Sequence, residues 1–600
     1  MSTPIPPDWS HCGHGADPAT DPIGCRGIHV PGHTACLAHL PDADRTSYLT
    51  SLAPGADIDH RGTPFTEPLL EALLNAVRDP TTAKPHLGTA RFDRVQFSGG
   101  AWFHEAQFSS SAFFGWAQFS GAAGFDRVQF SDDAQFGGAQ FSSAAFFGEA
   151  QFSSSADFTG AQFSGAAGFS RAQFSGAAKF GEAQFSSFAW FGEARFSHTA
   201  WFGGTRFSGN ADLGRARFEG VSVVGPLVCG GRVDLSMAVF GLPVTLEIAA
   251  RELVCERTRW ESTATVRVRY AAVDLRHAVL SAPVAVIAHP APFTGGLTGT
   301  VVIGEDLLTG SGRVRVVSVQ GVDAAHLVLT DTDLTGCLFS EAFHLDQIRL
   351  EGRTTFAPPP AGWHRRGLRP VRFTRRRTLA EEHHWRAHTA LQPALAAGED
   401  PQPHLWRPGL HHTDPARVPH PEDVAALYRQ LRKAFEDGKN EPGAADFYYG
   451  ECEMRRHDLT GTPKSERRLL WGYWLLSGYG LRASRAFAWL LAAMSLTVLC
   501  LMAAGLPTHD PDPATTGTLS GSRISLDTST PDPALHGGWS QRMTWPRTEK
   551  ATRVAINSVV FRSGGQNLTN AGTYIEMASR LLEPTLLALC LLAIRGRIKR

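Results

Sequence analysis

The sequence predicts a mainly β protein that contains a β-solenoid, a helical hairpin and two transmembrane helices. Three observations lead to this prediction. Phenylalanine recurs at alternating steps of five and six residues from Phe92 to Phe207. Apolar residues recur at helical spacing within residues 421–480, and two long apolar segments follow. Because 600 residues are too many for one ordinary domain, these signals are assigned to separate structural units.

The first 85 residues are predicted to form a small cap that is rich in cysteine and histidine. A tetrahedral zinc site needs four nitrogen or sulfur ligands. The ligands available here are Cys12, Cys25, Cys36 and His39. The spacing of these residues contains no CxxC pair, so we favour free thiols in a capping module and keep a zinc site as the alternative. No cofactor is expected apart from this possible zinc ion. Nine cysteines in 600 residues are an odd and sparse set, which favours reduced thiols.

Residues 86–220 carry the regular repeat. Ala stands two positions before most of the phenylalanines, as in Ala106 before Phe108. A helix cannot use this pattern, because a five-residue step scatters the rings around its axis. A coil that turns a corner in each unit places every ring in one narrow interior. The rings at the start of this predicted core are Phe92, Phe97, Phe103, Phe108, Phe114, Phe119, Phe125 and Phe130.

Individual units resemble a known family. Ala-Gln-Phe-Ser-Ser at 106–110 and Ala-Asp-Phe-Thr-Gly at 156–160 look like the pentapeptide repeat A-(D/N)-(L/F)-x-x. The resemblance implies a right-handed quadrilateral β-helix with four units in each coil. This chain departs from the family period by one extra residue in every second unit, as at Ser111. We interpret the extra residue as a bulged corner.

Charge argues against a nucleic-acid partner or a mimic of nucleic acid. The chain has 57 basic and 57 acidic residues, which cancel. Some pentapeptide-repeat proteins imitate DNA with an acidic surface. Residues 90–220 contain 11 acidic residues against nine Lys or Arg. So small an excess cannot imitate a phosphate backbone with one charge per ~1.7 Å.

The solenoid is expected to continue in degenerate form through residues 221–356. The phenylalanine rhythm ends near Gly220, but β-branched residues remain frequent, and a five-residue step returns between Leu334 and Phe339. Pro358-Pro359-Pro360 and the basic run Arg375-Arg376-Arg377 then mark an exit from the repeat. Residues 357–420 are rich in His and Pro and are predicted to be a linker.

Residues 421–480 are predicted to form a juxtamembrane helical hairpin. In its first helix the apolar residues are Val424, Leu427, Leu431 and Phe435, spaced for one helix face. The second helix begins near Ala444 and includes Met454. The pair resembles one tetratricopeptide-type unit, but a single unit is no solenoid. A basic cluster suited to anionic lipid headgroups comprises Arg455, Arg456, Lys464, Arg467 and Arg468.

Residues 481–600 are predicted to form a two-span membrane hairpin with an external loop. Ala486 to Leu506 is 21 residues without a charge, long enough to cross a ~30 Å hydrocarbon core. The second span is Tyr574 to Ile594. Basic residues precede the first span and follow the second, so both termini and the repeat domain are expected in the cytoplasm of a plasma-membrane protein. These basic residues are Arg467, Arg468, Arg482 and Arg485, then Arg595, Arg597, Lys599 and Arg600.

The hairpin also resembles the two-helix ion-channel module that some pentapeptide-repeat proteins carry. Residues 551–561 are expected to form a short re-entrant helix, followed by the glycine-containing stretch Ser563-Gly564-Gly565. No Thr-x-Gly-Tyr-Gly carbonyl ladder is present, so ion selectivity is not implied. Glu583 in the second span is an intramembrane acid, which suggests a functional group that faces the helix bundle; pairing with Arg580, three residues earlier, is the alternative.

No catalytic constellation is found in the sequence, and the chain is predicted not to be an enzyme. Glu381-Glu382-His383-His384 lacks the HExxH spacing of a helical metal site and is interpreted as a solvated helix face. The glycine-rich stretch at 295–299 lacks the Lys-Ser/Thr that a phosphate loop needs.

The sequence therefore predicts a membrane-anchored scaffold whose cytosolic rod binds an unidentified cytosolic protein and whose hairpin lies in the lipid bilayer. The alternative is a two-span ion channel or membrane sensor gated by the rod. Oligomerisation through the membrane hairpin is compatible with both interpretations.

Overall fold

The computed structural model describes residues 6–295, 300–301, 304–308, 312–366, 369–395, 402–409, 414–560 and 567–598. The chain divides into two compact units, Met1–Pro419 and His420–Arg600. Each unit is described by itself.

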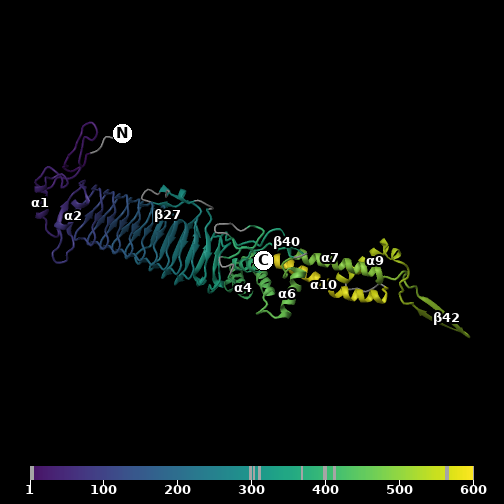
Figure 1. Cartoon of the computed structure of the whole chain (residues 1–600). Helices are drawn as coiled ribbons and strands as arrows, with labels where there is room; N and C mark the ends of the chain where they lie inside the picture. The colour runs from purple at the N-terminus through teal and green to yellow at the C-terminus, as the bar shows by residue number, and fades with distance from the viewer. Residues whose placement is uncertain are drawn as a thin grey trace. The chain divides into compact units, whose positions relative to one another are not determined.

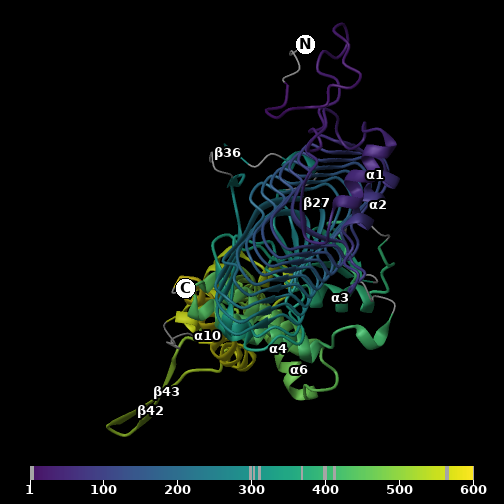
Figure 2. The ribbon, with the colours of Figure 1, turned by 90° about the vertical axis from the view of Figure 1, so that its left-hand side faces the viewer.

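The first unit is dominated by a parallel β-solenoid, as predicted (Figure 1). Each coil contributes short strands to four faces, and equivalent strands of successive coils pair in register. Gln129 lies opposite Gln107 of the preceding coil and Gln151 of the following coil. Equivalent residues such as Gln107 and Gln129 are 22 apart in the chain, which equals four units of alternating five and six residues. Figure 2 shows the same coils from one end of the stack.

Four columns of strands form the regular faces. The first face contains β3 (His86–Arg91), β7 (Ala112–Phe113), β11 (Ala134–Gln135), β15 (Ala156–Asp157), β19 (Ala178–Lys179) and β23 (Ala200–Trp201). The second contains β2 (Pro64–Phe65), β4 (Gln96–Phe97), β8 (Gln118–Phe119), β12 (Gln140–Phe141), β16 (Gln162–Phe163), β20 (Gln184–Phe185) and β24 (Arg206–Phe207).

The third face contains β5 (Ala101–Trp102), β9 (Ala123–Gly124), β13 (Ala145–Phe146), β17 (Ala167–Gly168), β21 (Ala189–Trp190) and β25 (Ala211–Asp212). The fourth contains β6 (Gln107–Phe108), β10 (Gln129–Phe130), β14 (Gln151–Phe152), β18 (Gln173–Phe174), β22 (Arg195–Phe196) and β26 (Arg217–Phe218). Strand β1 (Ala56–Asp59) pairs with β3.

The core is a set of stacked phenylalanine rings. Phe125 lies parallel to Phe147 of the next coil, with ring centroids 4.9 Å apart and planes at 2°. It also meets Phe136 edge to face at 5.3 Å and 86°. Both arrangements are favourable for aromatic quadrupoles. The eight phenylalanines from Phe92 to Phe130 are all buried in this interior.

Two kinds of corner alternate around each coil. In the five-residue steps, residues such as Glu149 and Arg171 have φ of +57°, and a turn hydrogen bond closes the corner. In the six-residue steps the chain bends through residues such as Ser109 and Ser110, next to the extra residue Ser111. Alternating corner types therefore account for the alternating step lengths.

Parallel pairing continues after Gly220 through β39. The longer strands of this part are β27 (Val223–Asp234), β29 (Val244–Val254), β31 (Ala264–Arg269), β32 (Ala272–Asp274), β34 (Val284–Ala288), β37 (Arg315–Ser318), β38 (Leu327–Thr330) and β39 (Arg349–Glu351). The fourth face continues as β28 (Val239–Phe240), β30 (Arg259–Trp260) and β33 (Val279–Leu280). Shorter elements are β35 (Thr294–Gly295), β36 (Thr300–Val301), η1 (Glu305–Leu307), η2 (Ala324–His326) and η3 (Leu345–Gln347).

Helices lie at both ends of the coil stack. Those at the N-terminal end are α1 (Asp42–Ser51) and α2 (Glu67–Ala76) (Figure 1). Those after the last coil are α3 (Ala380–Thr389) and η4 (Pro415–Arg417), and a hairpin of β40 (Trp363–Arg366) and β41 (Arg369–Arg372) precedes α3.

The expected solvated face on residues 381–384 is wrong. Glu381, Glu382 and His383 are 0%, 0% and 1% exposed. A Glu381 carboxylate oxygen accepts the backbone N–H groups of Phe339 at 2.5 Å and Ser340 at 3.0 Å. These groups belong to the end of the coil stack, where strand edges lack a further coil. Helix α3 therefore covers that edge, and this part of the predicted linker belongs to the folded unit.

The second unit begins with three helices, α4 (Pro421–Asp437), α5 (Glu441–His457) and α6 (Lys464–Ser477). Helices α4 and α5 form an antiparallel pair closed by Asn440, whose side chain accepts the N–H of Gly443 at 3.1 Å. The apolar stripe of α4 faces α5 and is buried at Val424, Leu431 and Phe435.

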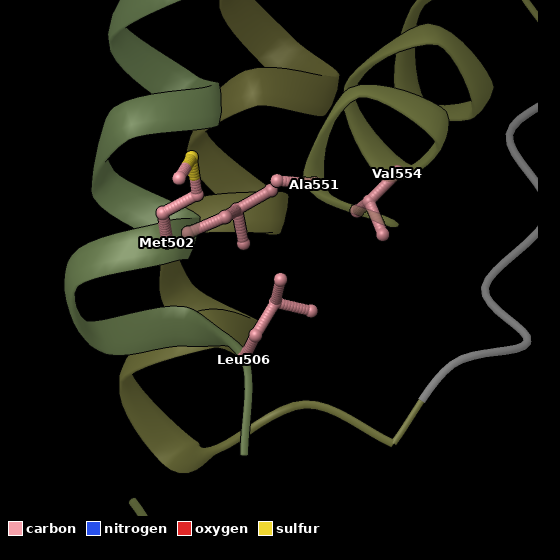
Figure 3. Packing of buried hydrophobic residues seen from close by; sticks show 5 residues of the cluster. Met502, Leu506, Ala551 and Val554 are labelled. Carbon is pink, nitrogen blue, oxygen red and sulfur yellow. The ribbon is translucent and has the colours of Figure 1, made fainter. Parts of the chain in front are cut away.

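The remaining elements are α7 (Ala483–Cys500), η5 (Leu501–Gly505), β42 (Ala514–Ser520), β43 (Arg523–Ser529), α8 (Trp539–Arg542), α9 (Trp545–Val560) and α10 (Asn570–Ile598). Two helices are long and apolar enough to cross a membrane, Ala483–Gly505 and Asn570–Arg595. The second predicted span, Tyr574 to Ile594, falls within the second helix, and the first, Ala486 to Leu506, extends one residue beyond the end of the first. Met502, Leu506, Ala551 and Val554 form a buried cluster where η5 meets α9 (Figure 3).

Candidate functional site

The four predicted zinc ligands converge at the N-terminal end of the first unit. The ligand atoms of Cys12, Cys25, Cys36 and His39 all lie within 4.8 Å of one another. The sulfurs of Cys25 and Cys36 are 3.7 Å apart. His39 Nδ1 lies 3.6 Å from the sulfur of Cys12 and 3.3 Å from that of Cys36. Residues separated by up to 27 positions thus present three sulfurs and one nitrogen to a common centre.

The local backbone shapes this cluster. The Gly27 N–H points at the Cys25 sulfur at 3.4 Å, a contact that stabilises a thiolate. A Cβ on Gly27 would lie 2.7 Å from the Cys36 Cβ and 2.8 Å from its sulfur, so only glycine lets Cys36 approach. Gly13 and Gly24 have φ of +63° and +66°, in the left-handed region that glycine adopts freely.

Two thiols of the cluster, Cys25 and Cys36, have shifted pKa values. Contact with the Cys36 thiol, followed by the Gly27 N–H and His39, lowers the pKa of Cys25 to about 5 despite partial burial. The contact with Cys25 and burial raise the pKa of Cys36. The first proton of the pair is therefore lost easily.

An aromatic row lies on the third face of the solenoid. It comprises Trp102, Phe146 and Trp190, which are 39%, 37% and 38% exposed, and Phe188 beside Trp190. Gly124 and Gly168 alternate with the three rings along the column. A Cβ on Gly124 would lie 2.7 Å from the Trp102 ring, so this glycine lets the Trp102 ring lie along the face.

A column of alternating charge follows the corners of the five-residue steps. Glu105 pairs with Arg127 at 3.1 Å, and Arg171 pairs with Glu149 at 3.0 Å and Glu193 at 3.3 Å. The side chains of these pairs are between 37% and 62% exposed, so each pair contributes only about 0–1 kcal/mol. Along this edge each acid has a base as its neighbour, which is unlike a row of phosphates.

A polar cluster lies between the two candidate spans in the second unit. Glu583 of α10 is 0% exposed. Its carboxylate accepts the hydroxyl of Thr497 from α7 at 2.7 Å and lies 3.0 Å from the hydroxyl of Ser558 on α9. The alternative, a pairing of Glu583 with Arg580, is wrong, because Arg580 pairs with Glu576 at 2.7 Å.

Sequence reasoning missed both Thr497 and Ser558. A single hydroxyl in an apolar helix carries little signal by itself, although an acid in the facing span indicates that a partner is needed. Helix α9 includes most of the expected re-entrant segment. Ser563-Gly564-Gly565 and the terminal residues Lys599 and Arg600 lie outside the described residues.

Comparison with known proteins identifies the repeat. The family model described as pentapeptide repeats (9 copies) matches residues 92–137, 125–173, 158–206 and 169–217. This part of the chain therefore consists of pentapeptide repeats. None of the curated proteins matches the chain, and neither does any solved structure.

Proposed function

From a pentapeptide-repeat solenoid joined to two apolar helices, we propose that this chain is a membrane-anchored scaffold whose rod binds a protein partner. The aromatic row is the observation that carries the binding part of the proposal. Adjacent strand layers are about 4.8 Å apart, so consecutive rings in the series Trp102, Phe146 and Trp190 are about 10 Å apart along the face. Protein interfaces are enriched in exposed aromatic residues of this kind, with polar residues at the rim.

The glutamine faces provide an internal contrast. Gln140 and Gln162 occupy the outward positions of the second face, opposite one another in paired strands. Their side chains are polar and flexible, so burying them costs entropy and yields little apolar contact area. A partner that binds through apolar contact therefore favours the third face.

A photo-reactive residue placed at Phe146 or at Gln140 tests this proposal in intact cells. Both positions are on strands of the same coil region and point outward. We expect a defined protein adduct from Phe146, identified by mass spectrometry, and none from Gln140. Substituting Trp190→Ser and Phe188→Ser should reduce the Phe146 adduct. Equal adducts at the two positions, or none at either, would contradict a docking role for the aromatic row.

Membrane anchoring is supported by the exposed apolar side chains of the two long helices. In each helix, only 28% of an apolar stretch of 18 residues is buried, whereas a core helix of a soluble protein is mostly buried. Leu496 and Leu581 are 62% and 76% exposed. Exposure of so many leucine side chains to water is unfavourable by roughly 25 cal/mol per Å², and lipid removes that cost.

Helix α6 supports the same proposal. Its first turns carry Lys464, Arg467 and Arg468, and its exposed Leu469 and Trp471 follow directly. Basic residues beside tryptophan and leucine are typical of helices that lie at a membrane surface. We infer that α6 contacts headgroups on the cytoplasmic side.

The proposed topology has a direct test. Strands β42 and β43 are exposed throughout and lie in the loop between the spans. A membrane-impermeant maleimide should label Ser520→Cys in intact cells and should label Lys439→Cys only after permeabilisation. Labelling of Lys439→Cys in intact cells would place the helical hairpin outside and contradict the cytosolic rod.

A two-span channel is the second candidate function, and the position of α9 favours it. Helix α9 packs against η5 through Met502, Ala551 and Val554 (Figure 3). The Ser558 hydroxyl of α9 lies 3.0 Å from the carboxylate of Glu583 on α10. A short helix held between two spans is the arrangement expected of a pore helix. A pore would also need several copies around an axis, so this proposal includes oligomerisation through the hairpin. Absence of conductance by the full chain in planar bilayers at any voltage would contradict it.

A further inference from the structure

We propose that Cys12, Cys25, Cys36 and His39 bind one structural zinc ion, which fastens the N-terminal segment to the first coil of the solenoid. This site is independent of the scaffold function. It concerns residues that belong neither to the aromatic row nor to the two apolar helices.

The distances agree with a zinc tetrahedron. Zinc binds sulfur at about 2.3 Å and nitrogen at about 2.0 Å, which puts two sulfurs about 3.8 Å apart and a sulfur and a nitrogen about 3.6 Å apart. The observed separation of the Cys25 and Cys36 sulfurs is 3.7 Å. The observed separations from His39 Nδ1 are 3.6 Å to Cys12 and 3.3 Å to Cys36. These three separations fit one ion at the centre, and the others, all within 4.8 Å, need the ligands to move by at most about 1 Å.

The ligand types select the metal and its role. Three thiolates and one imidazole suit zinc and do not suit magnesium or calcium, which prefer oxygen. Four protein ligands fill a tetrahedral shell and leave no position for water or substrate, which is the pattern of structural rather than catalytic zinc. The Gly27 N–H at the Cys25 sulfur supplies the outer-shell hydrogen bond that such sites use.

The segment around the site has few other means of holding its shape. Its buried apolar side chains are Ile23, Val30, Leu37 and Leu40. Small modules with so little core are commonly held by a metal or by disulfides. All nine cysteines are free thiols in this structure.

Contacts from this segment reach the first coil. The N–H of Ile28 donates to the Arg61 carbonyl at 2.8 Å, just before strand β2. The Trp9 ring lies under the Arg61 guanidinium at 4.9 Å, and its indole N–H donates to the Arg26 carbonyl at 3.0 Å. Arg26 directly follows Cys25, so a metal ion bound to Cys25 would also hold in place the residues that contact the first coil. Solenoids need such terminal caps, because an uncovered end exposes core and unpaired strand edges.

Metal analysis of the full chain tests the proposal without relying on any variant. The chain is purified in detergent under reducing conditions and its zinc content is measured by mass spectrometry. We expect about one equivalent per chain. Cobalt loaded in place of zinc should give the intense visible bands of a tetrahedral thiolate site. Less than about a tenth of an equivalent after incubation with zinc, or a Cys25–Cys36 disulfide in the purified chain, would overturn the proposal.

Variants then assign the ligands. Cys12→Ser should lose most of the bound zinc, and Gly27→Ala should weaken zinc binding by displacing Cys36. His33→Ala removes a nearby histidine outside the cluster and should keep the full content. Chelation should speed hydrogen exchange in residues 9–40 and leave the coils from β10 to β26 unchanged. Full zinc retention by Cys12→Ser would exclude this ligand set.

Discussion

The adjacent residues Phe146 and Phe147 show that a shift of one position along a strand decides whether a ring is buried or exposed. Phe147 is 0% exposed and stacks on Phe125 and Phe169, with centroids 4.9 and 4.8 Å away. Phe146 points outward and is 37% exposed. Alternation of side chains along a strand places the two rings on opposite sides of the same wall.

We predict that Phe147→Ala destabilises its coil by about 3–5 kcal/mol, because it removes a ring from a close-packed stack. Phe146→Ala is the matched control and should change the stability by about 0.5 kcal/mol or less. Hydrogen exchange of the strand amides in β13 and its neighbours measures both effects. Equal losses for the two variants would mean that the ring stack is not the source of stability.

Burial of His60 predicts a pH dependence at the N-terminal end of the solenoid. His60 is 0% exposed, and its ring lies 5.7 Å from that of Phe65 and 6.4 Å from that of Phe92. Burial lowers the pKa of His60 from 6.5 to about 4, although Asp59 acts in the opposite direction. Between these two pH values His60 is therefore protonated in the unfolded segment and neutral in the folded one.

The sign follows from this difference. Above pH 6.5 His60 is neutral in both states and the stability does not depend on it. As the pH falls from 6.5 towards about 4, the opening free energy of the first coil should decrease by roughly 3 kcal/mol in total. Hydrogen exchange of β1 to β3 between pH 7 and pH 5 measures the slope. The slope should persist in His104→Gln, an exposed control, and a persistent slope in His60→Leu would show another group to be responsible.

At the scale of elements, the hairpin of α4 and α5 depends on a glycine. Tyr428 of α4 is 0% exposed and lies against Gly450 of α5. A Cβ at Gly450 would come within 2.4 Å of the Tyr428 ring. Gly472 in α6 has no atom within 4 Å of the corresponding position.

These two glycines should respond in opposite directions to alanine. Gly450→Ala should destabilise the hairpin by about 1–3 kcal/mol, because the methyl group forces Tyr428 aside. Gly472→Ala should stabilise α6 by up to about 1 kcal/mol through its helix propensity. Hydrogen exchange of the α4, α5 and α6 amides in increasing urea compares the two variants. A stabilising Gly450→Ala would contradict the packing of Tyr428 on α5.

The solenoid was predictable because the same Ala and Phe positions recur in unit after unit at steps of five and six residues. The same pattern occurs in nearly every unit. It therefore stays visible although Leu213 stands in a phenylalanine position and Thr205 in an alanine position. The four residues of the candidate zinc site could be selected by residue type, although their spacing matches no short motif. Their convergence depends on turns at Gly13 and Gly24, whose left-handed φ a sequence only suggests.

Helix α3 was misread because its residues are polar. Burial of Glu382 depends on Arg376, whose guanidinium lies 2.6 Å from both carboxylate oxygens. That arginine belongs to the basic run interpreted as an exit signal. A basic run six residues before adjacent acids is compatible with an ion pair. The sequence alone does not show whether that pair is buried or solvated. The error at Glu583 was local, since Arg580 has Glu576 at the i,i+4 spacing that suits an ion pair.

At the scale of the whole molecule, the chain joins two units with different demands. In the first, backbone groups are satisfied by the next coil, and helices cover the ends. In the second, three helices meet around Glu583, and its partners must come from the protein because lipid offers none. The carboxylate joins α7, α9 and α10, so it couples the two candidate spans to the helix between them.

We predict that Glu583→Ala loosens α9 without unfolding the first unit. It removes the acceptor of the Thr497 hydroxyl and the neighbour of the Ser558 hydroxyl, and such contacts between membrane helices contribute about 0.6–2 kcal/mol. Amide exchange in α9 should therefore speed up by roughly 3-fold to 30-fold in reconstituted chain. Glu576→Gln is the matched control, because that acid pairs within its own helix with Arg580. Unchanged exchange in Glu583→Ala, or an equal increase in Glu576→Gln, would show that the carboxylate does not hold α9. If the hairpin conducts, Glu583→Ala should also alter the conductance in planar bilayers, because α9 would then be the pore helix that Glu583 positions.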